Sequence, residues 1–170
     1  HEDPTIDKAI NEVGALVGDE LMFAITKRTL EKANTNNFKD IVFDGYPRSQ
    51  EQYQLLKKFL EEKNSQIDIA IILEINIEES IKRLAARRIH KVTGEIFNLI
   101  TNPPGPEIKS EDLFTREDDN EVAIKERINK YLKATEPLIK ELETEGKVIR
   151  IHAEKPIADV AEEVKRALNL

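Results

Sequence analysis

The sequence contains no cysteine, so neither a disulfide framework nor a thiolate zinc site can form. It also lacks any apolar run near the roughly 20 residues that a membrane-spanning helix needs. No signal-peptide pattern is present at its start. Together these absences predict a cytoplasmic protein with no membrane partner.

The 170 residues that are present predict a globular protein. Hydrophobic residues make up 39% and charged residues 35%, and the chain is long enough for one domain with a buried core. The net charge of -7 argues against a nucleic-acid-binding surface, which is normally basic. Arginines nevertheless gather in two stretches, Arg83/Arg87/Arg88 and Arg116/Arg127, and this clustering predicts a local anionic ligand such as phosphate.

Strand-like and helix-like segments alternate, which predicts an α/β fold with a parallel sheet flanked by helices. Unbroken apolar runs at 41–43 and 69–75 are typical of strands buried on both faces, and 148–151 predicts a third strand. The pattern predicts helices over 6–13, 16–33, 49–62, 78–88, 121–142 and 156–168. Residues 90–115 carry a proline cluster and few large apolar residues, and are expected to form a small lid outside the core.

The first motif that carries chemistry is Asp44-Gly45-Tyr46-Pro47-Arg48, at the end of the predicted strand 41–43. Ligands of open α/β sheets bind beyond the carboxyl ends of strands, where an aspartate and an arginine suit Mg²⁺ and phosphate. The glycine would let a nucleotide approach the backbone. An ordinary turn is the alternative, because Asp, Gly and Pro are also turn residues.

Two further arginine motifs follow. Arg83 and Arg87 are expected four residues apart on one helix face, where like charges repel unless a ligand or an acid neutralises them. The alternative is a solvated basic face paired with Glu78 or Glu79. In Arg116-Glu117-Asp118-Asp119 the alternative is that one of the aspartates caps the following helix.

In their order and spacing these motifs resemble the adenylate kinases. The series is Asp-Gly-aromatic-Pro-Arg, a helix with Gln52, Arg-x-x-x-Arg-Arg, a Thr-Gly lid with Asn-Pro-Pro, and Arg-x-Asp-Asp. Gly14–Glu20 matches the family's Gly-x-Leu-Val-x-Asp-Glu, and Lys155-Pro156-Ile157 matches its closing segment. The resemblance covers nearly the whole chain.

The resemblance implies a P-loop-kinase-type parallel sheet with a lid insertion. The expected organisation is a partial core at 1–89, a lid at 90–117 and the C-terminal part of the core at 118–170. The implied reaction is reversible transfer of the γ-phosphoryl of Mg-ATP to AMP, which gives two ADP and belongs to nucleotide biosynthesis. ATP, AMP and ADP are the expected partners, and a cytoplasmic monomer is the expected form.

The resemblance also implies roles for individual residues. AMP is expected to contact Val17, Gly45, Arg48, Gln52, Arg116 and Arg127. ATP is expected at Arg83 and Arg87, and the water shell of Mg²⁺ at Asp44, with no direct protein ligand to the metal. The catalytic arginines would be Arg48, Arg87, Arg116 and Arg127, which would hold the transferring phosphates. A latch that closes the lid would be formed by Asp118 and Asp119.

The sequence departs from the family pattern in three places. Glu95 stands where the family often has arginine. His90 and Thr93 occupy the lid without any cysteine, so no structural zinc is expected. No Gly-x-x-x-x-Gly-Lys occurs, and the family's central first strand and phosphate loop are expected to precede residue 1. The 170 residues alone are therefore expected to be a fragment with little activity.

Two alternatives to an adenylate kinase remain at this point. One is a UMP/CMP kinase or a GTP-using nucleoside monophosphate kinase, although Gln52 suits adenine. The other is a non-catalytic nucleotide-binding module, although retention of the arginines at 48, 87, 116 and 127 argues against decay of the site.

Overall fold

The computed structural model describes residues 18–33, 38, 40–116 and 119–170. They form a mixed α/β structure, which confirms the predicted fold class. The chain divides into two compact units, one of His1–Ala70 with Lys133–Lys147 and one of Ile71–Leu132 with Val148–Leu170. Within the described ranges, no helix is long and apolar enough to cross a membrane.

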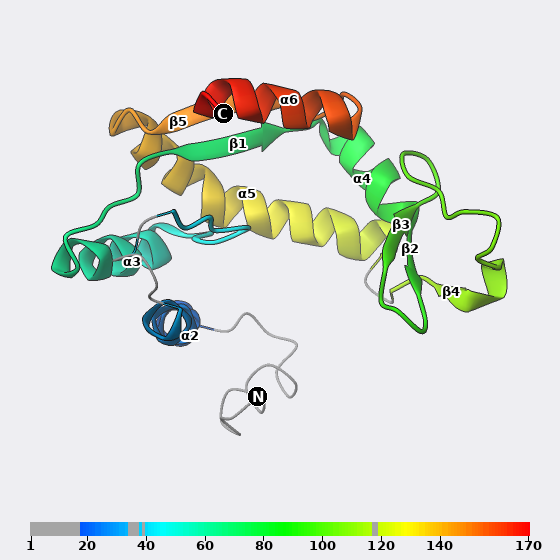
Figure 1. Cartoon of the computed structure of the whole chain (residues 1–170), viewed down its shortest axis with the longest axis horizontal. Coiled ribbons are helices and arrows are strands. Elements are labelled where there is room, and N and C mark those ends of the chain that lie inside the picture. Colours follow the sequence, from blue (N-terminus) through cyan, green and yellow to red (C-terminus); the bar gives the residue numbers. More distant parts are fainter. Residues whose placement is uncertain (1–17, 34–37, 39, 117–118) are drawn as a thin grey trace. The chain divides into compact units, whose positions relative to one another are not determined.

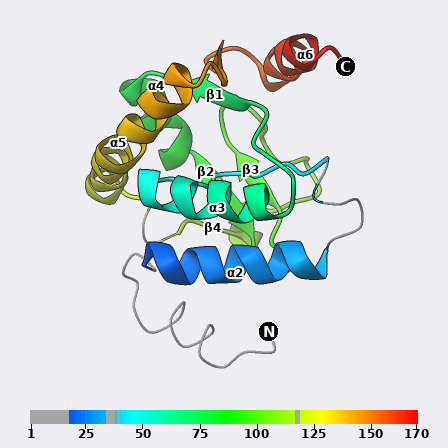
Figure 2. The same cartoon turned by 90° about the vertical axis from the view of Figure 1, so that its left-hand side faces the viewer.

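The first unit is built on helices α2 (Asp19–Lys32) and α3 (Gln50–Glu62), which lie side by side in both views of Figures 1 and 2. Phe59 of α3 joins them, because its ring meets Phe23 and Phe38 edge-on, with centroids 6.2 and 5.5 Å apart. Leu56 and Leu60 on the same face of α3 are almost completely buried. These contacts form the core of the unit.

A charged cluster connects α3 to the turn that follows α5 in the same unit. The Tyr53 hydroxyl donates to Glu145 Oε2 (2.6 Å), and Lys57 and Lys147 each place Nζ 2.7 Å from the same carboxylate. Hydrogen bonds from the two lysines and the tyrosine lower the pKa of Glu145 from 4.5 to about 2. Burial and the Glu145 carboxylate in turn raise the pKa of Tyr53 above its ordinary value.

The strand predicted at 41–43 is wrong. These residues are in neither described sheet, and Val42 is 92% exposed. An apolar run becomes a strand only when a neighbouring strand pairs with its backbone, and the described residues supply no such neighbour here. Phe43 instead packs against the core of the first unit.

The second unit contains the two-stranded sheet of β1 (Ala70–Glu74) and β5 (Val148–His152), which confirms the predicted strands 69–75 and 148–151. At its two ends the Ala70 amide donates to the Lys147 carbonyl and the Ala153 amide to the Glu74 carbonyl, as expected for parallel strands. Leu73 is 53% exposed, so the predicted burial of β1 on both faces is wrong. In the described part of the chain β1 has β5 as its one neighbouring strand. Helix α6 (Ile157–Leu168) follows Pro156 as predicted.

The predicted helix 78–88 ends earlier than expected. Helix α4 covers Ile77–Ala85, and β2 (Arg87–His90) begins two residues later. Arg87 and Arg88 pair with Asn98 and Phe97 of β3 (Ile96–Asn98), so the prediction that Arg83 and Arg87 share one helix face is wrong. Pairing with β3 replaces the helical hydrogen bonds there.

The region predicted as a lid contains an antiparallel sheet in the order β3-β2-β4. A short 3-10 helix, η1 (Ser110–Asp112), leads into β4 (Leu113–Phe114), which pairs with β2. Gly94 in the β2–β3 hairpin has a φ of 71°, which most side chains disfavour. The sheet places Phe97 inward, 7% exposed.

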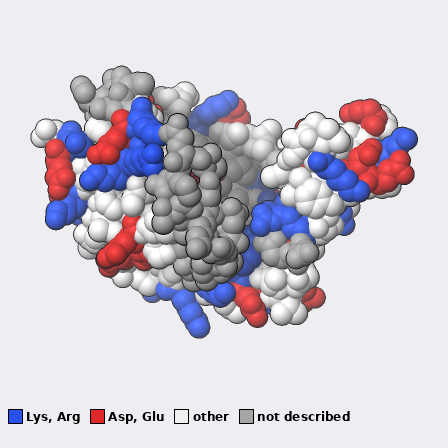
Figure 3. All heavy atoms as spheres, turned by 90° about the horizontal axis from the view of Figure 1, so that it is seen from below, with Lys and Arg blue, Asp and Glu red and all other residues white. Residues whose placement is uncertain are grey.

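Helix α5 (Glu121–Thr144) follows these strands and contains Pro137. Asn120 caps it by accepting a hydrogen bond from the Ala123 amide (3.0 Å), and not Asp119, which was one of the two predicted candidates. On the face that Figure 3 draws, basic and acidic side chains lie close to one another.

Candidate nucleotide site

The loop after 41–43 presents a glycine and an arginine together. Gly45 has a φ of 66°, and a Cβ at this position would lie 2.7 Å from a terminal nitrogen of Arg48. The Arg48 Nε donates to the Gly45 carbonyl (2.5 Å). The glycine therefore suits both the backbone turn and the close approach of the guanidinium group.

Gln52 lies one turn into α3, with its side-chain amide tied to neighbouring groups. The Arg48 backbone N–H donates to Gln52 Oε1 (2.7 Å), and Gln52 Nε2 donates to Asp19 Oδ1 (2.8 Å). Gln52 is 8% exposed. Its amide is consequently held in one orientation.

Ser49 and Thr135 complete the polar network around this loop. Ser49 is the N-cap of α3: its Oγ accepts from the Gln52 backbone N–H (3.2 Å) and donates to Asp19 Oδ2 (2.8 Å). Thr135 of α5 is 7% exposed and donates from Oγ1 to the Arg48 carbonyl (2.8 Å). The backbone on either side of the Arg48 side chain is thus fixed by hydrogen bonds.

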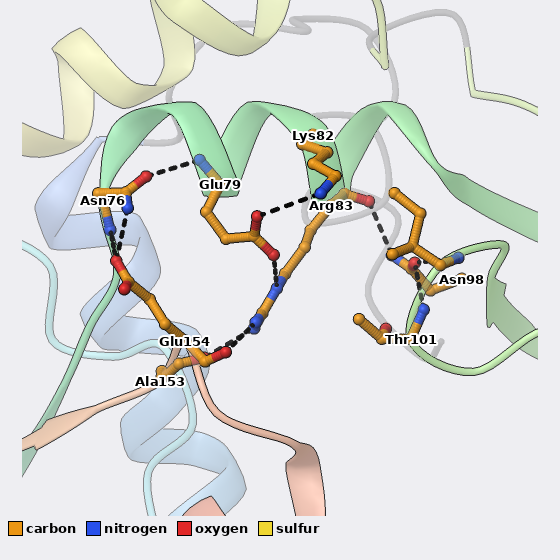
Figure 4. A network of polar contacts seen from close by, with 9 residues as sticks. Asn76, Glu79, Lys82, Arg83, Asn98, Thr101, Ala153 and Glu154 are labelled. Atoms are coloured by element: carbon orange, nitrogen blue, oxygen red, sulfur yellow. Dashed lines mark hydrogen bonds and ion pairs between the residues drawn. The ribbon is translucent and has the colours of Figure 1, made fainter.

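In the second unit, Arg83 of α4 lies in a separate polar network (Figure 4). Its Nε donates to Glu79 (2.8 Å), which confirms the predicted pairing of this basic face with Glu79. Its terminal nitrogens donate to the carbonyls of Ala153 (2.7 Å) and Glu154 (2.9 Å) in the turn between β5 and α6. The arginine therefore fixes this turn against α4.

Asn76 and Glu154 close the same network at the start of α4. The Glu154 carboxylate accepts from the backbone N–H (3.0 Å) and the side-chain amide (2.7 Å) of Asn76, which also caps α4 through the Glu79 amide. Asn98 of β3 donates to the Arg83 carbonyl (2.8 Å). Both ends of α4 are consequently anchored (Figure 4).

Arg87 and Asp119 form a buried ion pair in the second unit. Arg87 Nε lies 2.8 Å from Asp119 Oδ2, the Asp119 side chain is 0% exposed, and Arg127 reaches the same carboxylate at 3.8 Å. One carboxylate thus brings together two of the predicted phosphate-binding arginines. Arg116, another of the four predicted catalytic arginines, is exposed three residues before Asp119.

Among the remaining predicted site residues, the structure describes Asp44. Asp44 is exposed in the loop before Gly45. Val17 and Asp118 lie outside the described residues, as does the predicted helix 6–13. In the hairpin, His90 Nδ1 lies 2.9 Å from Thr93 Oγ1. Nowhere in the described ranges do three potential metal ligands gather.

Sequence reasoning gave no role to Asp19 or Thr135, although each carried a signal. Asp19 belongs to the Gly-x-Leu-Val-x-Asp-Glu match and lies near the start of the predicted helix 16–33, where an acidic side chain is favoured and can reach neighbouring donors. Thr135 interrupts the apolar face of the predicted helix 121–142, between Tyr131 and Leu138. A polar side chain on a buried face requires a hydrogen-bond partner, and this one bonds to the site loop.

Comparison with known proteins defines the family to which this arrangement belongs. The adenylate kinase family model matches residues 4–147. Adenylate kinase of Petrotoga mobilis is 34% identical over 161 residues, which cover 92% of this chain and 73% of the relative. The adenylate kinases of Caldicellulosiruptor bescii (34%, covering 96% and 77%) and Streptococcus equi subsp. zooepidemicus (36%, covering 95% and 75%) match similarly.

The class is therefore that of nucleotide-binding phosphotransferases with an α/β core. The chain belongs to the adenylate kinase family, as its motifs predict. The comparisons favour neither a UMP/CMP- or GTP-using kinase nor a non-catalytic module.

Proposed function

We propose that this protein transfers the γ-phosphoryl group of Mg-ATP to AMP and, in reverse, makes ATP and AMP from two ADP. The observation that carries the proposal is the loop from Asp44 to Arg48. In it, a glycine with positive φ lies against an exposed arginine whose backbone is fixed by Gln52 and Thr135. A preorganised guanidinium suits a phosphate monoester, because little ordering remains to be done on binding.

AMP binding falls to the first unit in this proposal. Within the described residues Arg48 uses Nε for the Gly45 carbonyl, so its two terminal NH₂ groups can bind the AMP phosphate end-on. Gln52 binds the adenine, and backbone at Val17 and Gly45 lines the pocket. The short distance between Gly45 and the guanidinium supports a glycine requirement in this pocket.

Phosphate clamping falls to Arg87, Arg116 and Arg127. In direct phosphoryl transfer the protein forms no covalent bond to the phosphoryl group. Cationic groups that stabilise the negative charge of the transferring group therefore supply most of the acceleration. Asp119 holds Arg87 and Arg127 in place until substrate phosphates bind. Asp118 and Asp119 together act as the latch of a lid at 90–117, whose closure excludes water from the reaction.

Arg83 flanks the ATP base. Three hydrogen bonds fix its guanidinium plane, and a fixed plane of this kind stacks well on an aromatic base. The division of the chain into 1–89, 90–117 and 118–170 is part of the same proposal.

The donor chemistry of the loop fits Mg²⁺ that arrives with ATP. Mg²⁺ prefers oxygen ligands and retains several waters, and the exposed carboxylate of Asp44 can accept hydrogen bonds from that water shell. Bound in this way, the ion neutralises charge on the phosphates. The lid is proposed to hold without zinc, through contacts such as that between His90 and Thr93. A cytoplasmic monomer completes the proposal.

A panel of acceptors tests the proposed substrate. The full-length enzyme is assayed with Mg-ATP and each of AMP, CMP, UMP and GMP, with ADP formation coupled to NADH oxidation. We expect kcat/KM for AMP to exceed that for each other acceptor by at least about a hundredfold, since mismatched polar groups in a pocket discriminate strongly. Preference for UMP or CMP would overturn the proposal.

The phosphate contact is tested by Arg48→Ala. Loss of a bidentate, charge-assisted contact should raise the KM for AMP by about tenfold to a hundredfold and leave the KM for ATP unchanged. Lys58→Ala, which removes an exposed cation on α3, the helix that follows Arg48, serves as the control and should change neither KM. An unchanged KM for AMP in Arg48→Ala would remove Arg48 from the AMP site.

A further inference from the structure

We propose that Asp19 determines base specificity, because it locks the Gln52 amide in the one orientation that suits adenine. This inference rests on the proposed placement of Gln52 against the AMP base. It assigns to Asp19 the part of a positioning residue that acts through Gln52.

The two ends of the Gln52 amide meet groups of opposite and fixed polarity. The Arg48 backbone N–H can only donate, and it lies 2.7 Å from Oε1. An ionised carboxylate can only accept, and Asp19 Oδ1 lies 2.8 Å from Nε2. A flipped amide would set NH₂ against N–H and oxygen against carboxylate, both at a site that is 8% exposed.

Asp19 is itself held in position. It lies in the first turn of α2, where the positive end of the helix favours a carboxylate. Its second oxygen accepts from Ser49 Oγ at 2.8 Å, and Ser49 Oγ accepts from the Gln52 backbone N–H at 3.2 Å. The three residues therefore form a ring of hydrogen bonds that closes through the Gln52 backbone, and the carboxylate cannot turn away without breaking two of them.

The amide groups that remain match one class of purine. A primary amide has two N–H donors and an oxygen with two lone pairs. In Gln52, one N–H donates to Asp19 and one lone pair accepts from the Arg48 backbone N–H. One N–H and one lone pair are left. Adenine needs both the free N–H and the free lone pair, because its N1 accepts a hydrogen bond and its 6-amino group donates one. Hypoxanthine and guanine have N1–H and O6, the reverse polarity, which only a flipped amide could satisfy.

Asp19→Asn tests the lock, because asparagine has the same size but can either accept from Gln52 or donate to it. The readout is the ratio of kcat/KM for AMP to that for IMP in the full-length enzyme. IMP differs from AMP only at this edge of the base. We expect the ratio to fall about tenfold, with the KM for ATP unchanged.

Glu20→Gln is the matched control: it removes the same charge from the next residue, which is exposed in the same helical turn, and should leave the ratio unchanged. Because both substrates are measured on one preparation, the ratio does not depend on the folded fraction. An equal loss of activity toward AMP and IMP in Asp19→Asn would show a merely structural role, and that result would overturn the inference.

Gln52→Ala separates this inference from the proposed function. If Gln52→Ala lowers kcat/KM for AMP while Asp19→Asn keeps the AMP-to-IMP ratio of the unchanged enzyme, the lock is wrong and the AMP site stands. If Gln52→Ala leaves AMP kinetics unchanged, the placement of Gln52 against the base is wrong and the inference fails with it. A loss in Gln52→Ala together with the fall in ratio in Asp19→Asn supports both.

Discussion

Asp119 receives Arg87 on both of its carboxylate oxygens, through Nε to Oδ2 at 2.8 Å and a terminal nitrogen to Oδ1 at 2.5 Å. The carboxylate side chain is 0% exposed, and that of Arg87 is 19% exposed. Two charges withdrawn from water in this way depend on each other, because either one left alone would be desolvated and unpaired. The pair therefore links β2 to the residue before the cap of α5.

Asp119→Ala should consequently destabilise the protein strongly. Removal of one partner of a buried ion pair costs about 3 kcal/mol, and we expect a loss of that size in the free energy of unfolding. Urea denaturation followed by circular dichroism measures it. Glu121→Gln removes the partner of Lys125 in an exposed pair and should have almost no effect. Equal effects of the two changes would contradict a structural role for Asp119.

Glu145 should make the stability of the first unit depend on pH. Its pKa is lowered from 4.5 to about 2 in the folded state, so its contribution is present above pH 4.5 and is lost as the pH falls toward 2. A shift of this size corresponds to about 3 kcal/mol. Glu145→Gln should therefore be less stable at pH 7, with the difference shrinking at pH 2 to 3.

Thermal or urea unfolding of both proteins between pH 2 and 7 measures this effect. Glu136→Gln in α5 is the control, because its pair with Lys140 is exposed and should contribute less than about 1 kcal/mol at any pH. A gap between Glu145→Gln and the unchanged protein that stays constant from pH 7 to pH 2 would show that the cluster does not act through the ionised carboxylate.

Thr135→Val should weaken the fold and the AMP site together. Valine has the shape of threonine but leaves the Arg48 carbonyl without its 2.8 Å donor, which costs about 1 to 2 kcal/mol. Because the same carbonyl belongs to Arg48, the KM for AMP should also rise. Thr135→Ser keeps the hydroxyl and should restore the KM for AMP; failure of serine to do so would separate Thr135 from the site.

Arg83→Lys tests the proposed ATP-base contact. Lysine keeps the charge but cannot reproduce the fork that binds Glu79 and the carbonyls of Ala153 and Glu154. We expect the KM for ATP to rise about tenfold and the KM for AMP to stay constant. Arg88→Lys, whose guanidinium bonds to the local carbonyls of residues 85 and 87, is the control. A rise in the KM for AMP alone would contradict the assignment.

The elements that sequence predicts well here are those whose signal is local. The helix at 50–62 shows an N-cap serine and apolar residues at helical spacing, and the apolar run at 69–75 becomes β1. The prediction of a strand at 41–43 is wrong because an apolar run indicates only which side chains are expected to be buried. Pairing of its backbone depends on another segment of chain.

The candidate site was also predicted where its signal is local and missed where it depends on distant residues. The motif around Arg48 and Gln52 is read directly from the sequence. For Arg83 the sequence offered Glu78 or Glu79 as a partner, and the structure shows Glu79. The end of α4 could not be read, because no glycine or proline separates Ala85 from Arg87. The antiparallel partner that draws Arg87 into β2 begins nine residues later, at Ile96. Contacts such as Asp19 with Gln52 join distant residues and appear only in the folded chain.

The transfer reaction itself gives the most direct test of the account. The full-length enzyme is incubated with Mg-ATP labelled in the γ-phosphoryl group and with unlabelled AMP, and the products are separated. We expect the label to appear in the β-position of ADP, and only when AMP is present. Arg48→Ala should slow its appearance. Release of the label as inorganic phosphate, at the same rate with or without AMP, would contradict phosphoryl transfer to AMP.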